Sequence, residues 1–342
     1  MELTDLMEES IKIQENDFFK KKFFYSFSSL SKLMWSPAVF HSIYVLGLRE
    51  EKTESYLVQG KLIHLLLLEE DKFNEDFIIS PSSLPSDNTR KIIDRVFKHY
   101  LELSKNGDTR ENLDEYKNAI LDVLKDVNLH QSLTTDDQRI SKIITSETIS
   151  YWDFLKNKGN KTLIDQSTYD FCKNAVDLIK TDKKICDLLG IGVTDFDNKE
   201  VHNELEFKFS LENKNYGFKG IIDNLVVDHD AKKIIVNDLK TTSKELKDFS
   251  ESVEYYSYWI QCIIYMLFVS NNYAKLIENG YVVDFNFVVI DKMWQVYAFP
   301  VTTPTLNYWL NKFTTLMEEA QWHYDNKSYD LPYKFANNLV TL

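Results

Sequence analysis

The 342-residue chain is poor in the residues that build disulfide scaffolds and flexible linkers, with three cysteines, nine glycines and six prolines. The cysteines form no CxxC pair, so neither a structural zinc site nor a disulfide framework is indicated. No apolar run reaches the roughly 18 residues that span a bilayer, and the acidic, polar N-terminus lacks the basic and apolar parts of a secretory signal. We therefore expect a soluble, unexported protein of the reducing cytoplasm, without a membrane segment.

The formal net charge of −13 excludes a protein whose whole surface grips nucleic acid, because phosphate binding depends on lysine and arginine side chains that release condensed counterions. It does not exclude a local contact. A metal-binding cleft gathers carboxylates by necessity, and a basic strip such as Lys20–Lys22 can still hold a phosphate backbone. The simplest alternative explanation of the surplus acid is ordinary solubility.

Hydrophobic periodicity divides the chain into a helical first half and a mixed second half. The expected helices lie at about 26–48 with a break at Pro37, 53–70, 90–103, 111–127 and 166–189. Short β-branched and aromatic runs then predict strands at 201–211, 216–228 and 232–239, followed by a helix at 252–273, strands at 281–290 and 294–300, and a helix at 304–325.

This order of elements predicts an α/β (α+β) fold with a mixed central β-sheet flanked by helices. The three sequential strands should form an antiparallel meander, because tight turns join them. We expect an acidic leader at residues 1–24 and a single domain at residues 25–342. That domain should contain a polar helical insertion at about 86–150 and the core meander at 201–240.

Two acidic residues and a lysine fall where neighbouring strands of the meander meet. Asp223 lies on the second expected strand and Asp238 near the end of the third, and Lys240 completes the sequence Asp-Leu-Lys. Since side chains alternate along a strand, Asp238 and Lys240 should point to one face. Desolvated charge without a partner is costly, so a hard divalent cation such as Mg²⁺ is the natural partner of the two carboxylates. Such a site predicts metal-assisted phosphodiester hydrolysis, with Lys240 stabilising charge that builds at the phosphoryl oxygens.

Further candidates have simpler explanations beside the functional one. Glu204 and Glu206 share a face of the preceding strand and could extend the acidic cluster, although they also fit the solvent face of an amphipathic strand. His64 could supply a metal ligand, but a core histidine fits the same apolar helix. Gly60, four residues earlier, would let that helix approach another backbone closely. An isolated Asp-x-Lys is a weak signal, so the prediction depends on the ordered set of residues.

In order and spacing, the motifs of this chain resemble those of the PD-(D/E)XK nucleases, in particular the RecB-like branch. The motifs are Gly60-xxx-His64, Glu204, Lys219-Gly220-Ile221-Ile222-Asp223, Asp238-Leu239-Lys240-Thr241-Thr242 and Gln261-xxx-Tyr265. Within that branch the chain more closely resembles the phage and prophage exonucleases related to RecE, over most of residues 25–270. The resemblance implies a restriction-endonuclease-like core with a helical N-terminal or inserted region.

The same resemblance implies a role for each matching residue. The implied metal ligands are His64, Asp223, Asp238 and the Leu239 carbonyl. The implied catalytic residues are Asp223, Asp238, Lys240 and Glu204, which matches the family's acidic position better than Glu206 does. The residues that would contact DNA or support the site are Gln261, Tyr265, Lys219 and Thr241.

The resemblance further implies a Mg²⁺- or Mn²⁺-dependent exonuclease that resects linear double-stranded DNA ends for phage-type recombination, in a bacterial or phage-infected cell. Its expected partners are duplex DNA ends and a single-strand annealing protein, and ring-forming relatives imply a homo-oligomer. Two alternatives stay open. One is an endonuclease or defence-system nuclease of the same fold, and the other is a DNA-binding or assembly module without cleavage.

The chain also departs from the family pattern. Trp35-Ser36-Pro37 stands where several relatives carry a cluster-binding cysteine, so no iron–sulfur cluster is expected. Asn237 precedes Asp238 at a place where a central strand usually has an apolar residue. This asparagine indicates that the sheet face behind it is partly polar.

Overall fold

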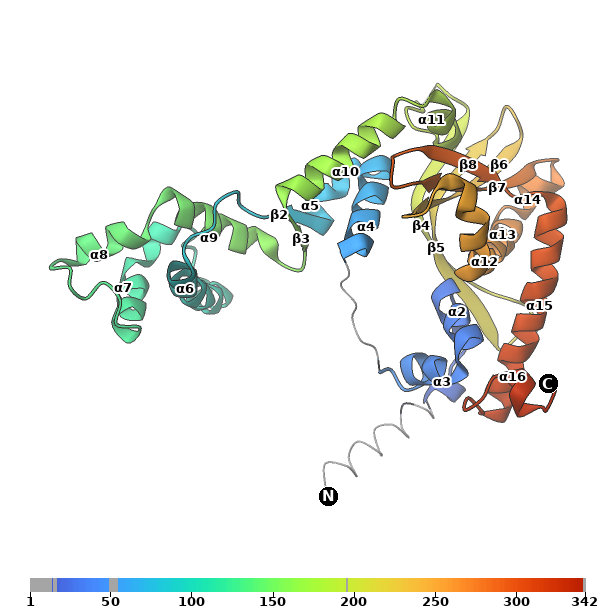
Figure 1. Ribbon diagram of the computed structural model, residues 1–342, viewed down its shortest axis with the longest axis horizontal. Helices are drawn as coiled ribbons and strands as arrows, with labels where there is room; N and C mark the ends of the chain where they lie inside the picture. Colours follow the sequence, from blue (N-terminus) through green and yellow to red (C-terminus); the bar gives the residue numbers. More distant parts are fainter. Residues whose placement is uncertain (1–13, 15–16, 49–54, 195, 341–342) are drawn as a thin grey trace, which may run out of the picture. The chain divides into compact units, whose positions relative to one another are not determined.

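The computed structural model of the chain describes residues 14, 17–48, 55–194 and 196–340 (Figure 1). The chain divides into two compact units, one from the segments 1–68 and 175–342 and the other from residues 69–174. The second unit is thus inserted in the first along the chain. The leader expected at residues 1–24 lies largely outside the described residues, and the sequence-based limits of one domain with an insertion at about 86–150 stay a prediction.

Within the described residues, a six-stranded mixed sheet forms the centre of the first unit. Its strands are β1 (Phe23–Tyr25), β4 (Lys199–Ser210), β5 (Tyr216–Asp228), β6 (Lys233–Thr241), β7 (Val282–Ile290) and β8 (Val296–Pro300). The antiparallel pairs β4–β5 and β5–β6 make the expected meander. β7 pairs with β6 in parallel, β8 pairs with β7 in antiparallel, and β1 lies parallel to the start of β5. This mixed sheet with flanking helices confirms the predicted fold class.

One face of the sheet carries the main hydrophobic core of this unit. Alternate strand residues, such as Val236 on β6 and Phe285 on β7, point into it. Helices α2 (Phe27–Trp35), α13 (Tyr258–Asn272) and α15 (Thr303–Asn326) cover this face (Figure 1). Their buried side chains complete the core. α13 is buried along most of its length, which explains its nearly continuous apolar sequence. This packing anchors the strands that carry the acidic residues.

Helices α4 and α11 lie on the opposite face. α4 (Ser55–Leu68) matches the helix expected at 53–70. Residues 53 and 54 of that prediction lie outside the described part of the chain. α11 (Lys183–Leu189) falls within the helical region expected at 166–189. Asn237 follows a core residue of β6, so it points to this other face, where it donates to a carbonyl of α11. The face is therefore partly polar, as the asparagine indicated.

The prediction of a single long helix at 252–273 is wrong. The chain instead forms α12 (Phe249–Tyr255) and α13, separated by Tyr256 and by Ser257, which has a left-handed backbone (φ 58°, ψ 38°). Neither glycine nor proline marks this break, so the hydrophobic pattern showed no sign of it. Around the break, the rings of Tyr256 and Tyr258 stack with centroids 5.5 Å apart.

The remaining elements of the first unit are short, namely α3 (Pro37–Phe40), η1 (His41–Val45), η4 (Leu246–Asp248), α14 (Ala274–Glu278) and α16 (Tyr333–Ala336). α10 (Gln166–Ile179) begins in the second unit and ends in the first. The break expected at Pro37 is confirmed, because Ser36 caps α3 and the proline occupies its first turn. Within the described ranges, no helix has the length and apolarity that crossing a membrane requires.

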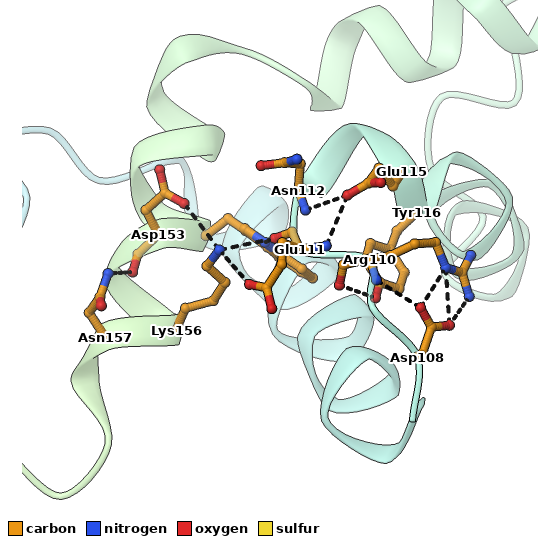
Figure 2. Close-up of polar contacts among 10 residues, drawn as sticks. Asp108, Arg110, Glu111, Asn112, Glu115, Tyr116, Asp153, Lys156 and Asn157 are labelled. Carbon is orange, nitrogen blue, oxygen red and sulfur yellow. Dashed lines mark hydrogen bonds and ion pairs between the residues drawn. The ribbon is translucent and has the colours of Figure 1, made fainter. Parts of the chain in front are cut away.

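The second unit has its own small hydrophobic core between helices. Its elements are η2 (Glu70–Lys72), α5 (Phe73–Asp76), β2 (Phe77–Ile79), α6 (Asp87–Lys105), η3 (Leu113–Tyr116), α7 (Lys117–Asp126), α8 (Asp136–Ile143), α9 (Ser146–Lys158) and β3 (Thr162–Ile164), with β2 and β3 paired in parallel. Figure 2 shows how the loop before η3 is held. Lys156 Nζ lies 3.0 Å from Glu111 Oε2, and Glu115 accepts the backbone amides of Glu111 and Asn112. Such contacts give this polar, charge-rich stretch a defined structure.

Candidate functional site

Three side chains from different elements converge at one point beside the sheet. His64 of α4, Glu204 of β4 and Asp223 of β5 each offer one ligand atom, and these atoms lie within 4.8 Å of one another. His64 Nδ1 lies 3.9 Å from Asp223 Oδ2. Asp223 is buried and the other two are half-buried. The structure thus brings together three of the residues that the sequence predicted for the site.

Glu204 reaches this point through an irregular backbone. Its φ of 47° lies in the left-handed region, which a non-glycine residue in a strand rarely adopts and which costs on the order of 1–3 kcal/mol. The register of β4 and β5 is the same before and after this residue, with Asn203 opposite Asn224 and Leu205 opposite Ile222. Glu204 therefore stands opposite Asp223. Glu206 is exposed. Of the two acids that the sequence left open, Glu204 is the one in the cluster.

The backbone of Leu239 on β6 supports the cluster. Its amide donates a 2.7 Å hydrogen bond to Asp223 Oδ2, and its backbone acts on His64 in the direction that raises the pKa of the imidazole. α4 comes this close to β6 because Gly60 faces Thr241. A Cβ on Gly60 would lie 3.0 Å from Thr241 Oγ1, which is a tight contact. The glycine therefore allows the close approach that the sequence indicated.

Asp238 and Lys240 form a buried ion pair beside the cluster, with Lys240 Nζ 2.5 Å from Asp238 Oδ2. Asp238 is 0% exposed, and apart from this ammonium neither of its oxygens accepts a hydrogen bond from the described residues. Lys240 Nζ also lies 3.4 Å from the Leu239 carbonyl oxygen and 5.0 Å from the centre of the Tyr258 ring. The ammonium is held between an acid, a carbonyl and an aromatic face.

Burial and mutual contact shift the ionisation of these groups. Burial, together with the nearby Lys240 ammonium, lowers the pKa of His64 to about 4, so its imidazole is neutral near pH 7. Burial raises the pKa of both Asp223 and Asp238, against the pull of Lys240. For Lys240, burial by itself lowers the pKa, but the two aspartates outweigh it and raise the pKa above its ordinary value. The lysine is therefore cationic at neutral pH.

The donor set fits a hard divalent cation. Glu204 and Asp223 offer carboxylate oxygens and His64 a neutral nitrogen, while the Asp238 carboxylate and the Leu239 carbonyl both contact Lys240 Nζ on β6. Among the described residues Lys240 alone contacts the oxygens of Asp238, and a buried carboxylate with so little support is costly unless a further cation can approach it. Oxygen-rich sets of this kind suit Mg²⁺ or Mn²⁺ better than a structural zinc ion.

The remaining predicted residues lie around the cluster. Tyr265 is buried, its hydroxyl donates to the Ile221 carbonyl, and it accepts a 2.6 Å hydrogen bond from Gln261 Nε2. This pair braces β5 two residues before Asp223. Lys219 is exposed and, with residues of β1 and α2, lines a surface pocket of about 410 Å³. At about 3.4 Å per strand residue, Lys219 stands about 14 Å along β5 from Asp223.

Sequence reasoning did not single out two features of the site. One is Tyr258, whose ring faces Lys240. It is one of many aromatic residues in its segment, so no pattern marked it. The other is a set of asparagines that each neighbour a predicted acid in the chain, Asn203, Asn224 and Asn237, of which the sequence marked only Asn237. The recurrence of an asparagine beside an acid on three consecutive strands was the signal available.

Comparison with known proteins identifies the family. No curated protein matches the chain. Among solved structures, the chain is similar to a candidate exonuclease from Eubacterium rectale, whose crystal structure was determined at 2.19 Å resolution. The two share 13% sequence identity with a TM-score of 0.45, over 92% of this chain and 85% of that chain. The family model of the PD-(D/E)XK nuclease superfamily matches residues 25–321, which include the whole cluster and its ion pair. The chain belongs to the PD-(D/E)XK nuclease superfamily.

Proposed function

We propose that the protein is a divalent-metal-dependent deoxyribonuclease that works as an exonuclease on the ends of linear double-stranded DNA. The cluster of His64, Glu204 and Asp223 beside the Lys240–Asp238 ion pair carries this proposal. It combines ligands for a hard cation with a fixed positive charge, and both stabilise the transition state of phosphodiester hydrolysis.

In this proposal His64, Glu204 and Asp223 hold the metal ion, Mg²⁺ or Mn²⁺, and Asp238 and the Leu239 carbonyl are further ligands. The bound ion supplies an activated water and neutralises charge on the phosphate. The neutral state of His64 supports its role, since a protonated imidazole does not bind a metal.

Lys240 is the proposed catalytic lysine. Its ammonium stays protonated because two buried acids raise its pKa, and its contacts with Asp238 and Tyr258 restrict its position. A cation that is fixed before the substrate binds stabilises the negative charge developing on the phosphoryl oxygens without reorganisation. In this proposal the ion pair with Asp238 therefore orients the lysine toward the scissile phosphate.

A short run of tyrosines leads from Lys240 to the surface. Tyr258 faces the ammonium, Tyr256 stacks on Tyr258, and Tyr255 meets Tyr256 edge-on with centroids 4.9 Å apart. Tyr255 is 79% exposed and Tyr256 is 51% exposed. Nucleic-acid bases stack on exposed aromatic rings with a gain of about 1–3 kcal/mol per base. We assign these rings to the DNA strand that approaches Lys240.

The finer features of the proposal rest on the resemblance of the motifs to those of RecE-type exonucleases. They are the attack from the ends of linear duplex, a role in phage-type recombination with a single-strand annealing protein, and a homo-oligomeric state. The net charge of −13 suits a protein that contacts DNA only locally, near the site.

Digestion of one plasmid, both as a closed circle and as a linear duplex, tests the proposal. The reactions contain Mg²⁺, Mn²⁺ or EDTA, and an Asp223→Asn preparation serves as the control for contaminating nucleases. We expect metal-dependent loss of the linear form alone. Nicking of the circle would favour an endonuclease or defence-system nuclease, and no cleavage with either metal would favour a binding or assembly module.

A further inference from the structure

A continuous row of hydrogen-bonded asparagines crosses the sheet one residue away from the candidate metal ligands. Asn237 Nδ2 donates to Asn224 Oδ1 at 2.8 Å, and Asn224 Nδ2 donates to Asn203 Oδ1 at 2.8 Å. The three residues are direct neighbours in the register of β4, β5 and β6. Asn224 and Asn237 are each 0% exposed. We call these three residues the asparagine row.

The row also binds the C-terminal carbonyls of helices α4 and α11. Asn203 Nδ2 donates at 2.8 Å to the carbonyl of Leu68, the last residue of α4. Asn224 and Asn237 donate in the same way to carbonyls at the end of α11, at 2.9 and 3.0 Å. The last carbonyls of a helix have no partner within that helix. A side-chain amide that donates to them therefore fixes the helix end on the sheet.

The two central amides use all of their hydrogen-bonding groups. Asn224 donates to two acceptors and accepts from Asn237. Asn237 also donates to two acceptors, and it accepts at 3.0 Å from Asn286 of β7. An aspartate has no hydrogen to donate and an aliphatic residue has no polar atom, so either would leave buried carbonyls without a donor. The row thus requires amides at these positions.

The row lies beside the candidate ligands because of the residue order on each strand. The acid follows the asparagine on β4 and β6 and precedes it on β5, which runs in the opposite direction. The asparagine row therefore places Glu204, Asp223 and Asp238 side by side, one residue further along the three strands. A slip of one residue would turn an acid to the other face. Through Leu68, the row also fixes the end of the helix that carries His64.

We infer that Asn203, Asn224 and Asn237 are positioning residues of the metal site, which hold ligands from α4, β4, β5 and β6 close enough for one divalent cation to bind them together. This inference rests on the proposed function. The three asparagines act through their neighbours in the chain and through the helix ends. Removing groups that orient metal ligands typically changes metal affinity or activity by about 10–100-fold.

Asn203 is the residue to test, because it is half-buried at the end of the row and adjoins Glu204. In Asn203→Val, the Leu68 carbonyl loses its donor and β4 is no longer tied to α4. We expect the Mn²⁺ affinity of the full chain, measured from the electron paramagnetic resonance signal of free Mn²⁺, to fall about 10–100-fold. Cleavage at low Mn²⁺ should fall with it and recover as Mn²⁺ is raised. Asn203→Ser, with a smaller side chain, replaces the valine variant if that variant does not fold.

Asn286→Val is the matched control, because it removes an asparagine that donates to the row from β7, a strand without candidate ligands. We expect it to lower the Tm and to leave the Mn²⁺ affinity unchanged. If the Asn203 variants lose thermal stability but bind Mn²⁺ as the wild type does, the row is a structural element only and the inference is overturned. If the wild type neither binds Mn²⁺ nor cuts DNA, the proposed function fails and the inference with it.

Discussion

The backbone amide of Leu239 donates a 2.7 Å hydrogen bond to the carboxylate of Asp223. This bond ties β6 to β5 beyond the last register pair of the two strands, Asn224–Asn237, because Asp223 lies one residue from Asn224 and Leu239 two residues from Asn237. A hydrogen bond to a carboxylate favours its charged form, so it offsets part of the rise in the pKa of Asp223 that burial causes. The backbone of the Asp-Leu-Lys segment thus orients an acid of the neighbouring strand. Supporting contacts of this kind hold a site in its productive geometry.

Lys240→Ala should reduce DNA cleavage by about 10²–10³-fold, because it removes a positive charge fixed near the phosphoryl oxygens. The fold should persist, since Asp238 can take up a proton once its partner is gone and burial already raises its pKa to about 6. Lys244→Ala is the control, because this partly exposed lysine pairs with Glu251 on the surface at 3.5 Å. Rates on an end-labelled linear duplex measure the effect, and a Lys240 variant as fast as wild type would remove the lysine from catalysis.

Asp238 should make the stability of the metal-free protein depend on pH. Burial raises its pKa from 3.8 to about 6, so the folded state binds this proton more tightly than the unfolded chain does. The contribution favours folding below about pH 4 and is lost as the pH rises through about 6. Asp238→Asn mimics the protonated acid. In EDTA its free energy of unfolding should exceed that of the wild type by on the order of 3 kcal/mol near neutral pH.

Urea unfolding of both proteins, near neutral pH and again at about pH 4, measures this difference. The two free energies of unfolding should approach each other at the lower pH, because the wild-type acid is then protonated in the folded state and partly protonated in the unfolded chain. An asparagine variant that is the less stable protein near neutral pH would contradict the view that the buried carboxylate of Asp238 opposes folding without a metal.

The meander could be predicted because local patterns specify it, whereas the acids were chosen from the order of the motifs along the chain. Asp238 and Lys240 lie two residues apart on one strand, and alternation puts both on one face, where the structure has their ion pair. The choice of Glu204 over Glu206 could not be made, since it depends on one left-handed residue, with a φ of 47°, that no strand pattern encodes. The break at Ser257 was missed for the same reason, as its φ of 58° occurs without glycine or proline. The extent of the second unit depends on long-range contacts, on which hydrophobic periodicity carries no information.

Gly60→Ala should weaken metal binding without unfolding the protein. The new Cβ would lie 3.0 Å from Thr241 Oγ1, so the contact must widen by a few tenths of an ångström, and we expect α4 to move away from β6 and to carry His64 with it. Alanine favours a helix over glycine by about 1 kcal/mol, which opposes any loss of stability from the contact. Calorimetric titration with Mn²⁺ should give an affinity between those of the wild type and His64→Ala.

The double variant Gly60→Ala/Thr241→Ala provides the rescue. Removing Oγ1 makes room for the methyl group, so α4 can return and the Mn²⁺ affinity should rise toward that of the wild type. If the double variant binds Mn²⁺ as weakly as Gly60→Ala does, the contact between these two residues does not set the position of His64.

Tyr256→Ala should weaken DNA binding more than it slows the chemical step. The ring is 51% exposed and stacks on Tyr258, which faces Lys240, so a base stacked on it would lie near the reacting phosphate. Loss of a stacked base costs about 1–3 kcal/mol, which corresponds to a rise in Kd or KM of about 5–150-fold. Tyr256→Phe keeps the ring and removes only the hydroxyl group, so it should bind DNA as the wild type does. Fluorescence anisotropy in EDTA measures binding without cleavage. If the alanine variant binds as tightly as the phenylalanine variant, the tyrosines are not the stacking surface, and the DNA reaches Lys240 along another path.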